Sequence, residues 1–336
     1  MSKILVTGGL GMLGSAISEK FLANWNEVVI VDNEIREGVQ FNREKVKKAT
    51  IIKKDINKLK KDSKPLKDIN GIIHCAANPG VPVSLERPLY DFENNALGTL
   101  NMLELARVKD VPFLYCSTNK VYPQELIDKK GWELKGNRYE FKDGKPFQFT
   151  NDIVGGTHSP YGCSKLTGDI YCSEYANAYG VQTVANRMSC IYNTGQFGNE
   201  EQGWLAHFVF CSLLNKPINI YGDGMQVRDV LFGTDTAELY YMQMMRIKEF
   251  AGTKWQVGGG SENTLSLLEL VSMLEEMNNM KFQVNYHPWR TADHRVYVSD
   301  IEPIKKMGWK PTTSVKEGIS QLNEWAKQAI KNGWYK

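Results

Sequence analysis

The sequence lacks the features that mark secreted, membrane-spanning and nucleic-acid-binding proteins. Its six cysteines form no Cys-x-x-Cys pair and do not cluster with histidine, which argues against a zinc site and a disulfide framework. No run of about 18 consecutive apolar residues is present, and the apolar run at 4–6 is too short for a signal peptide. The formal net charge is only +3, so polyanion binding is not expected. We therefore expect a soluble, cytoplasmic protein with no metal, membrane or nucleic-acid partner.

What the sequence does contain is an alternation of strand and helix patterns typical of α/β proteins. Its 336 residues suffice for about two domains, and its 42% hydrophobic and 24% charged residues are normal for a globular chain. Strands are predicted at 3–7, 28–31, 50–52, 69–75, 113–117 and 182–186, with helical patterns at 12–22, 95–108 and 164–179. The alternation predicts a Rossmann-type, doubly wound parallel sheet. After about residue 186 a smaller mixed α/β domain is expected, and 123–157 form a long loop-like segment.

A glycine-rich turn follows the first predicted strand. Gly8, Gly11 and Gly14 have the spacing G-x-x-G-x-x-G and open a helix that continues with Met12 and Leu13. Glycines permit a tight turn and a close approach of the backbone to a pyrophosphate at the helix N-terminus. This context predicts a dinucleotide site of the short-chain dehydrogenase type.

An acidic residue completes the dinucleotide pattern. Asp32 ends the second predicted strand, 18 residues after Gly14, where a carboxylate can accept hydrogen bonds from the adenosine ribose. Because a carboxylate repels a 2′-phosphate, Asp32 favours NAD over NADP. For Asp55 a surface charge is an almost equal alternative, and for the alanine pair plain packing competes. The further expected cofactor contacts are Asn33, Asp55, Ile56, Ala76 and Ala77.

Three residues form a candidate catalytic set. Tyr161 and Lys165 are spaced i, i+4 on one face of a helix that starts near 164 or just before it. A phenol has a pKa of about 10, and a neighbouring ammonium together with a positive nicotinamide lowers it. Thr118 ends a predicted strand and can bind the reacting oxygen. The set predicts that Tyr161 acts as a base on a hydroxyl group.

With these motifs the sequence resembles the extended short-chain dehydrogenase family of nucleotide-sugar epimerases and dehydratases over almost its whole length. Further matching segments are Asn95-x-x-Gly98-Thr99, Arg187-x-x-x-x-Tyr192, Gly222-Asp223-Gly224, Arg228-Asp229 and Arg295. Within the family it looks most like the 2-epimerases of CDP-linked 3,6-dideoxyhexoses, through 117–122, 158–165, 202–204, 224–231 and the 123–157 insert. The resemblance implies an NAD-dependent isomerase that keeps its cofactor bound through each turnover.

The resemblance also implies which residues bind ligands. Asn95 and the catalytic pair Tyr161 and Lys165 would contact the cofactor, whereas Arg228 and Arg295 would grip the diphosphate of the substrate, for which guanidinium forks are suited. A surface salt bridge is the alternative for each arginine. Trp204 is placed to stack on a base or a sugar, with core packing as an even alternative. The complete set of expected substrate contacts is Asn119, Lys120, Arg187, Gln202, Trp204, Arg228 and Arg295.

The residues after Thr118 discriminate between reactions. The 4,6-dehydratases of this family carry Asp-Glu there, whereas this sequence has Asn119-Lys120, which cannot serve as that acid/base pair. Dehydration is therefore disfavoured. The resemblance implies inversion at C2 of CDP-paratose or CDP-tyvelose through a keto intermediate, a carbon that the residues alone do not choose. The alternatives are a UDP-sugar 4-epimerase and a non-catalytic NAD-binding regulator. A mechanism that deprotonates carbon through Lys120, Cys163 or Cys190 also competes, although a small buried apolar role is expected for the cysteines.

The expected domain boundaries follow from these assignments. An NAD-binding domain would comprise 1–186 and about 228–255, and a nucleotide-sugar-binding domain would comprise 187–227 and 256–336. The resemblance further implies a homodimer formed through the helices at 95–108 and 164–179.

Overall fold

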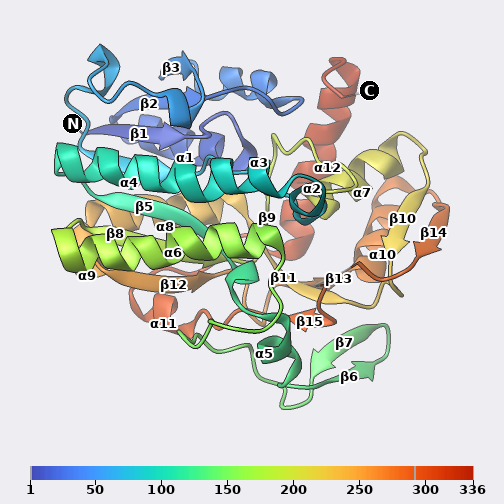
Figure 1. Cartoon of the computed structure of the whole chain (residues 1–336). Coiled ribbons are helices and arrows are strands. Elements are labelled where there is room, and N and C mark those ends of the chain that lie inside the picture. The colour runs from blue at the N-terminus through green and yellow to red at the C-terminus, as the bar shows by residue number, and fades with distance from the viewer. Residues whose placement is uncertain (1, 291–292, 336) are drawn as a thin grey trace. The chain divides into compact units, whose positions relative to one another are not determined.

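The computed structural model describes residues 2–290 and 293–335 (Figure 1). The chain folds into two compact units, each assembled from three stretches of sequence. The first consists of Met1–Val121, Ser159–Met188 and Gly233–Trp255, and the second of Tyr122–His158, Ser189–Phe232 and Gln256–Lys336. Each unit has a hydrophobic cluster of its own.

The first unit contains the expected doubly wound sheet. Its seven strands lie in the order β12-β8-β5-β4-β1-β2-β3, and the pairs among β1 to β5 and β8 are parallel. The strand order reverses between β1 and β4, and ligands bind beyond the carboxyl ends of the strands at such a switch point. The prediction of a Rossmann-type sheet is therefore confirmed. The strands are β1 (Lys3–Thr7), β2 (Glu27–Asp32), β3 (Thr50–Lys53), β4 (Gly71–His74), β5 (Phe113–Thr118), β8 (Thr183–Met188) and β12 (Thr253–Val257).

Helices pack on both faces of this sheet. In Figure 1, α4 (Gly98–Lys109) and α6 (Pro160–Tyr179) lie side by side on the near face, and α1 (Met12–Ala23) packs against α8 (Gly233–Met245). Strands covered on both faces are apolar on both sides, which explains the uninterrupted runs from which they were predicted. The other helical elements are η1 (Val39–Glu44), η2 (Ile56–Lys58), η3 (Lys64–Leu66), α2 (Val81–Glu86), α3 (Pro88–Phe92), η4 (Glu93–Leu97), η5 (Asn119–Val121) and α9 (Ile247–Phe250).

The second unit is a mixed α/β assembly. β11 pairs with β9, β13 and β15, and β10 pairs in parallel with β14. Side chains of α7, α10 and α12 form its core with those strands. Within the described part of the chain, no helix is long and apolar enough to cross a membrane. The elements are β9 (Cys190–Tyr192), α7 (Trp204–Leu213), β10 (Ile218–Tyr221), β11 (Val227–Phe232), β13 (Thr264–Ser266), α10 (Leu267–Asn278), β14 (Val284–His287), β15 (Val296–Tyr297), α11 (Glu302–Lys306) and α12 (Val315–Lys331).

Residues 122–158, called the insert below, are more ordered than the loop expected from the sequence. They contain α5 (Gln124–Asp128) and an antiparallel hairpin of β6 (Trp132–Lys135) and β7 (Arg138–Phe141). The hairpin turn is the two-residue loop 136–137, in which Gly136 has a φ of +61°. A Gly-Asn loop is a known hairpin signal, but the flanking strands are short and rich in charge, so no apolar run marks them.

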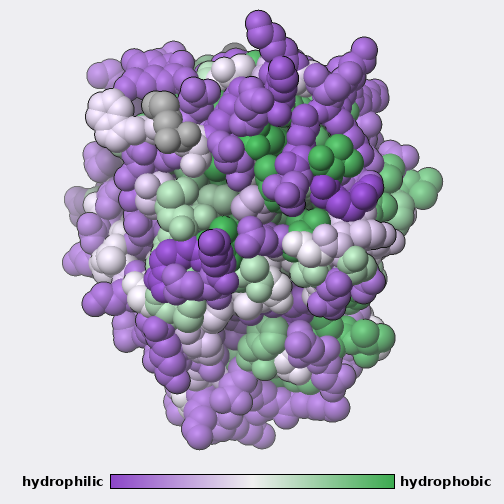
Figure 2. All heavy atoms as spheres, turned by 90° about the vertical axis from the view of Figure 1, so that its left-hand side faces the viewer, coloured by the Kyte–Doolittle hydropathy of each residue, from purple (hydrophilic) through white to green (hydrophobic). Residues whose placement is uncertain are grey.

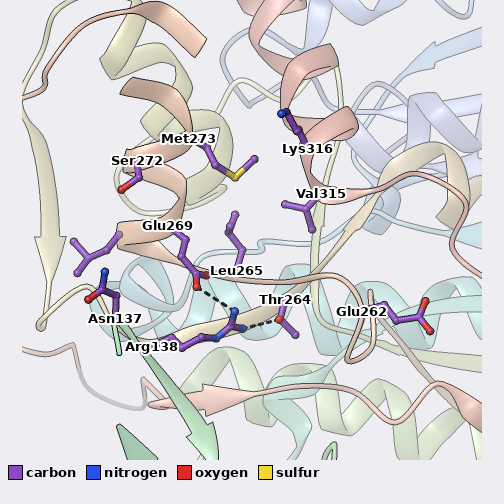
Figure 3. A pocket seen from close by; sticks show the side chains of 11 residues that line it. Asn137, Arg138, Glu262, Thr264, Leu265, Glu269, Ser272, Met273, Val315 and Lys316 are labelled. Carbon is purple, nitrogen blue, oxygen red and sulfur yellow. Dashed lines mark hydrogen bonds and ion pairs between the residues drawn. The ribbon is translucent and has the colours of Figure 1, made fainter. Parts of the chain in front are cut away.

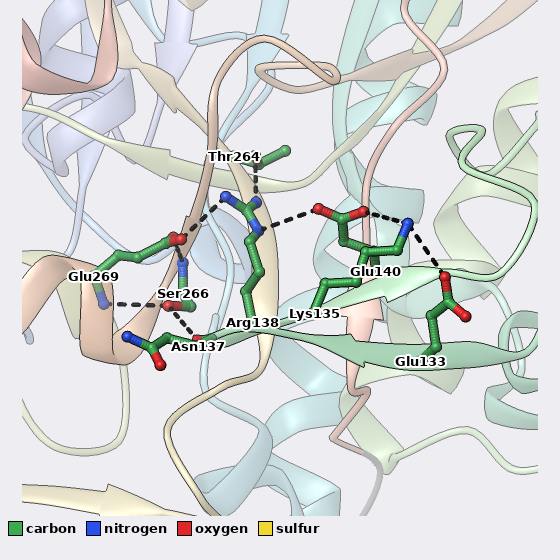
Figure 4. A network of polar contacts seen from close by, with 8 residues as sticks. All are labelled: Glu133, Lys135, Asn137, Arg138, Glu140, Thr264, Ser266 and Glu269. Atoms are coloured by element: carbon green, nitrogen blue, oxygen red, sulfur yellow. Dashed lines mark hydrogen bonds and ion pairs between the residues drawn. The ribbon is translucent and has the colours of Figure 1, made fainter.

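The insert also departs from the expected domain boundaries, because it belongs to the second unit rather than to 1–186. A network around Arg138 explains this (Figure 4): its guanidinium bonds Glu269 (3.1 Å) and Thr264 (2.6 Å) at the start of α10 and on β13. Backbone bonding continues the attachment, since the N–H of Tyr139 donates to the carbonyl of Met225 (3.0 Å). These partners lie far along the sequence and could not be read from local pattern.

Candidate active site

The glycine-rich turn lies between β1 and α1 and can accommodate a phosphate. A Cβ atom on Gly14 would lie 2.2 Å from the carbonyl oxygen of Gly8, and one on Gly8 would lie 2.7 Å from the backbone nitrogen of Ala76. Gly8 also has a φ of +64°, which favours glycine. Gly11 is the N-cap of α1, and no side chain caps that helix end. The first N–H groups of α1, at 12–14, therefore suit the pyrophosphate of a dinucleotide.

Asp32 is held at the end of β2 by two backbone hydrogen bonds. Its Oδ2 accepts from the N–H of Leu10 (3.0 Å) and its Oδ1 from the N–H of Glu34 (2.8 Å). Burial raises the pKa of the carboxyl, and the two bonds oppose that rise. Because Leu10 belongs to the glycine turn, the carboxylate lies beside that turn, and each oxygen keeps a lone pair for a ribose hydroxyl.

The other expected cofactor residues follow the ends of neighbouring parallel strands, so they share one edge of the sheet. Asp55 caps η2 by accepting from the N–H of Asn57 (2.8 Å), and the N–H of Ala76 donates to Thr7 Oγ1 (3.3 Å). Each thus has a local structural role in its turn. After β2, β3 and β4 respectively come Asn33, then Asp55 and Ile56, then Ala76 and Ala77.

Asn95 has a different environment from the one expected of a cofactor contact. Its side chain is fully buried and bonds Asn78, Asp91 and Ser164, all at 2.7–3.0 Å. Asp91, which the sequence did not single out, also accepts from Ser164 Oγ at 2.5 Å. Burial raises the pKa of Asp91. This network fixes the chain after β4 to α6, directly beside Lys165.

The three expected catalytic residues come together in the first unit. α6 begins at Pro160, four residues earlier than 164, because Ser159 caps the helix by accepting from the N–H of Gly162. Tyr161 is therefore in the first turn, and Lys165 lies one turn later. The hydroxyl of Thr118, at the end of β5, bonds the Tyr161 hydroxyl and lowers its pKa. Burial outweighs this bond and raises that pKa to about 12, opposite to the lowering expected from the neighbouring lysine.

Lys165 is buried among aromatic and sulfur groups. Its side chain is 3% exposed, and its Nζ lies 4.2 Å from the centre of the Tyr115 ring. Burial lowers its pKa to about 8, so at neutral pH it carries a proton and a poorly solvated charge. One turn after Tyr161 on α6, this ammonium lies on the same face of the helix as the phenol.

Two neighbouring groups were not identified from the sequence. Cys75, directly after β4, and Cys116, within β5, have sulfurs 3.3 Å apart, and the Tyr240 hydroxyl donates to Cys116 Sγ (3.1 Å). His74 contacts Thr7 and Thr99, and burial lowers its pKa to about 3, so it stays neutral. The contact with Cys116 and burial also raise the pKa of the Cys75 thiol, so His74 and Cys75 are uncharged close to Lys165.

The cysteines proposed as alternative bases do not share one environment. Cys163 is exposed on α6, so the expectation of a buried apolar role is wrong for it, and Cys190 is half-buried in the second unit. Asn119 is buried next to Thr118, and the N–H of Lys120 donates to Thr118 Oγ1 (3.2 Å). Across the described residues, no cluster of acidic, histidine or cysteine side chains could hold a metal ion.

Arg187 is buried in an ion-pair network rather than exposed to a ligand. It is 0% exposed, and its guanidinium forms two bonds with the carboxylate of Asp169, at 3.0 and 2.9 Å. Lys254 and Ser117 bond the same carboxylate, at 2.7 and 2.9 Å. Arg187 was expected to contact the substrate. In the structure it instead links β8 to α6 through Asp169.

In the second unit, Arg228 and Arg295 lie on neighbouring strands. β11 and β15 pair in parallel, with Arg228 opposite Tyr297, and the N–H of Val227 donates to the carbonyl of Arg295 (2.9 Å). Arg228 forms an ion pair with Asp293 at 2.5 Å, so the salt-bridge alternative applies to it in this structure. Arg295 instead lies against tryptophan rings.

Two further expected contacts have mainly structural surroundings. Gln202 forms an isolated bridge with Asn199, through backbone bonds of 3.0 and 3.1 Å. Trp204 opens α7 and packs edge-on against Phe208, with ring centres 5.9 Å apart. Core packing is thus the observed arrangement of Trp204.

Besides Arg228 and Arg295, the second unit has a third arginine, Arg290, in a polar cluster that the sequence did not indicate. The guanidinium of Arg290 lies 3.9 Å from the centre of the Tyr221 ring and donates to the carbonyl of Glu200 (2.9 Å). The Tyr221 hydroxyl donates to the Glu200 carboxylate, which lowers the pKa of that carboxyl. His287 also stacks on the Tyr221 ring, with ring centres 5.1 Å apart. No motif spacing links these residues.

Comparison with known proteins agrees with this geometry. Residues 4–258 match the NAD dependent epimerase/dehydratase family. CDP-paratose 2-epimerase of Salmonella typhi is 34% identical over 96% of this chain and 98% of its own length. A putative UDP-glucose 4-epimerase of Methanocaldococcus jannaschii is 31% identical over 96% of this chain and 98% of its own.

Solved structures have the same fold. UDP-glucuronic acid 4-epimerase of Bacillus cereus, in complex with UDP-glucuronic acid and NAD, superposes with a TM-score of 0.82 at 26% identity, covering 97% of this chain and 99% of that one. UDP-glucose 4-epimerase of Thermotoga maritima, solved with UDP-glucose, has a TM-score of 0.83 at 25% identity and covers 98% of this chain and 99% of that one.

Proposed function

Because the chain belongs to the NAD-dependent epimerase/dehydratase family, we propose that it inverts C2 of a CDP-linked 3,6-dideoxyhexose, such as CDP-paratose or CDP-tyvelose. The chain is an NAD-dependent sugar epimerase, hence an isomerase, and NAD is its cofactor. The choice of a CDP-sugar is supported by the 34% identity, over almost the full length of both proteins, to a CDP-paratose 2-epimerase.

The proposed reaction type rests on one observation: the catalytic set is intact, but the acid/base pair of the dehydratases is missing. Thr118, Tyr161 and Lys165 meet in the first unit, whereas Asn119 and Lys120 occupy the positions of the dehydratase acids. A carboxamide and an ammonium cannot both protonate a leaving hydroxyl and deprotonate carbon at neutral pH. The site is therefore equipped to oxidise and reduce a hydroxyl-bearing carbon without eliminating water.

The residues of the chain divide the proton chemistry between them. Tyr161 takes the proton of the sugar hydroxyl as the carbonyl forms and returns it when the alcohol is restored. Thr118 holds the reacting oxygen, and the Lys165 ammonium stabilises the phenolate form of Tyr161. Bound NAD supplies a hydride acceptor in the first half of the cycle and a hydride donor in the second. The glycine turn and Asp32 are the groups of this chain that would hold it.

A homodimer is proposed from the surface of the first unit. Figure 2 shows a largely hydrophilic face with hydrophobic patches gathered toward its right, the side on which α4 and α6 lie in Figure 1. A monomer rarely leaves so many large apolar side chains exposed on adjacent helices. Those on the α2–α4 stretch and on α6 are Leu85, Leu89, Phe92, Leu97, Val108, Ile170, Tyr171 and Tyr179.

The second candidate function is a UDP-sugar 4-epimerase, which the M. jannaschii relative favours. Purified protein should be incubated with CDP-paratose and, separately, with UDP-glucose, and the sugar ring protons followed by NMR. We expect the C2 proton signals of the CDP-sugar to convert to those of its epimer. Turnover of UDP-glucose alone would reject the C2 proposal.

A further inference from the structure

The insert is closed on itself at its base and fastened to the rest of the second unit at its hairpin. At its base, the carboxylate of Glu125 accepts bonds from the N–H and the hydroxyl of Thr157, at 2.7 and 2.5 Å. At the hairpin, the Tyr139 hydroxyl donates to Asp223 Oδ2 (2.5 Å), next to the backbone bond between Tyr139 and Met225. The hairpin is thus held against the chain that leads into β11.

The far edge of the hairpin is fixed to α10. Figure 4 shows the Arg138 guanidinium between Glu269 and Thr264, while Ser266 Oγ bonds the carbonyl of Asn137 (3.5 Å). Glu269 also completes the capping box of α10 with Ser266. Because these bonds join the turn and the first residues of β7 to α10, β13 and the chain before β11, the position of the hairpin is determined by the folded unit.

The open cavity beside this turn is not the place for a diphosphate. It has a volume of about 450 Å³, and Arg138, Glu269, Met273 and Lys316 are among the side chains around it (Figure 3). Its charges are mixed, and the Arg138 guanidinium is already bonded to Glu269 and Thr264. An anion would have to compete with that carboxylate.

Arg295 offers a positive charge in a different setting. Its guanidinium carbon lies 3.3 Å from the centre of the Trp289 ring and 5.6 Å from that of Trp132, which comes from β6 of the insert. Trp289 lies flat on the backbone of Gly222, where an added Cβ would be 2.7 Å from the indole. Among the described residues Arg295 forms no ion pair, and its Nε is buried without a hydrogen-bond partner, although its guanidinium is hydrogen-bonded to the Tyr139 hydroxyl.

The register of the small sheet places the two expected phosphate-binding arginines on one face. Arg228 is opposite Tyr297, and Arg295 is two residues before Tyr297. Side chains two residues apart on a strand point to the same face, so Arg295 shares the face of Tyr297. Arg228, opposite Tyr297, lies on that face too. The insert therefore reaches the same face of the sheet through Trp132.

We propose that the insert is part of the substrate-binding machinery, with Trp132 as a positioning residue that holds the Arg295 guanidinium ready to bind the diphosphate of a nucleotide sugar. This inference rests on the proposed function. Stacking engages the faces of the planar guanidinium. Apart from the bond to Tyr139, its in-plane N–H donors are left for phosphate oxygens. A guanidinium held in this way loses less conformational entropy when it binds an anion.

The test measures binding of CDP to the NAD-loaded protein by calorimetry, with CMP as a probe that lacks the second phosphate. We expect Trp132→Leu to weaken CDP binding about fivefold and CMP binding less, because the guanidinium loses one stacking partner. Trp132→Phe should retain affinity within about twofold of wild type, since a phenyl ring still stacks. Leu134→Ala is the matched control, because Leu134 lies on the same strand and is 53% exposed.

A double-mutant cycle separates positioning from general loosening of the fold. Arg295→Gln alone should weaken CDP binding, and adding Trp132→Leu to it should have no further effect, because the group that Trp132 positions is then absent. NAD content and melting temperature of each variant report the integrity of the fold.

Three results would overturn the inference: wild-type CDP affinity in Trp132→Leu, equal losses in Leu134→Ala, or a full additional loss when Trp132→Leu is added to Arg295→Gln. Wild-type affinity for CDP in Arg295→Gln would overturn it as well, even if every Trp132 variant failed to fold. If the wild-type protein binds neither CDP nor UDP, the proposed function itself fails, which is a result distinct from these.

Discussion

Lys165→Met is expected to stabilise the cofactor-free protein while it abolishes turnover. Lys165 is 3% exposed, and burial lowers its pKa from 10.5 to about 8. That difference corresponds to about 3 kcal/mol of unfolding free energy, at roughly 1.36 kcal/mol per pH unit. Loss of the contact between Nζ and the Tyr115 ring, at 4.2 Å, costs about 1 kcal/mol. A net gain of about 2 kcal/mol should remain, because methionine fills a similar volume without a charge.

The gain should depend on pH with a defined sign. Because the folded-state pKa of Lys165 is lowered, the unfolded chain binds more protons than the folded protein between about pH 8 and the ordinary lysine pKa of 10.5. Wild-type stability therefore rises relative to that of the variant as the pH increases through this interval. The advantage of Lys165→Met should be complete below pH 8 and largely absent at pH 10.5.

Urea unfolding of the NAD-free proteins at pH 6.5, 8, 9 and 10, followed by circular dichroism, measures this difference. Lys67→Met is the control, since Lys67 is an exposed lysine of the same unit and should show no such effect. The reasoning would be refuted if Lys165→Met were less stable than wild type at pH 6.5. It would also be refuted by a stability difference that stays constant across the pH series.

Two further substitutions test the site and its support. Tyr161→Phe removes the proton acceptor and should lower kcat about 10³-fold at unchanged NAD content, measured by NMR turnover and by cofactor release; wild-type activity would disprove the proposed role. Asp169→Asn leaves Arg187 and Lys254 without their carboxylate inside the first unit and should reduce the unfolding free energy by about 3–5 kcal/mol in urea. A loss below about 1 kcal/mol would show that the network is dispensable.

Features that depend on residues close in sequence were predicted well. The turn at Gly8, Gly11 and Gly14 is local, and so is the helical spacing of Tyr161 and Lys165 on α6. Strands covered on both faces carry long apolar runs, which made the sheet and its doubly wound class visible from the sequence. Helix α6 begins at Pro160 rather than near 164, because proline is favoured at the first helical position, where its missing N–H is not needed.

Features that depend on distant partners were not predicted. Arg187 was expected at the substrate because its motif resembles the family, but its surroundings are set by Asp169 and Lys254, which lie on other elements. The hairpin of the insert offered only its Gly136 turn as a signal. Its attachment depends on Glu269, more than a hundred residues away.

The difference between locally determined features and those set by distant partners bears on which substrate the protein selects. Thr118, Tyr161 and Lys165 can act on any secondary hydroxyl, so the same set serves a 2-epimerase and a 4-epimerase alike. The carbon that reacts must then be selected by the groups that hold the nucleotide and its diphosphate. In this chain those candidates are Arg228 and Arg295, and the surroundings of Arg295 are completed by Trp132 of the insert. Specificity for C2 should therefore change with substitutions in the insert, whereas substitutions in the catalytic set should change the rate for every sugar.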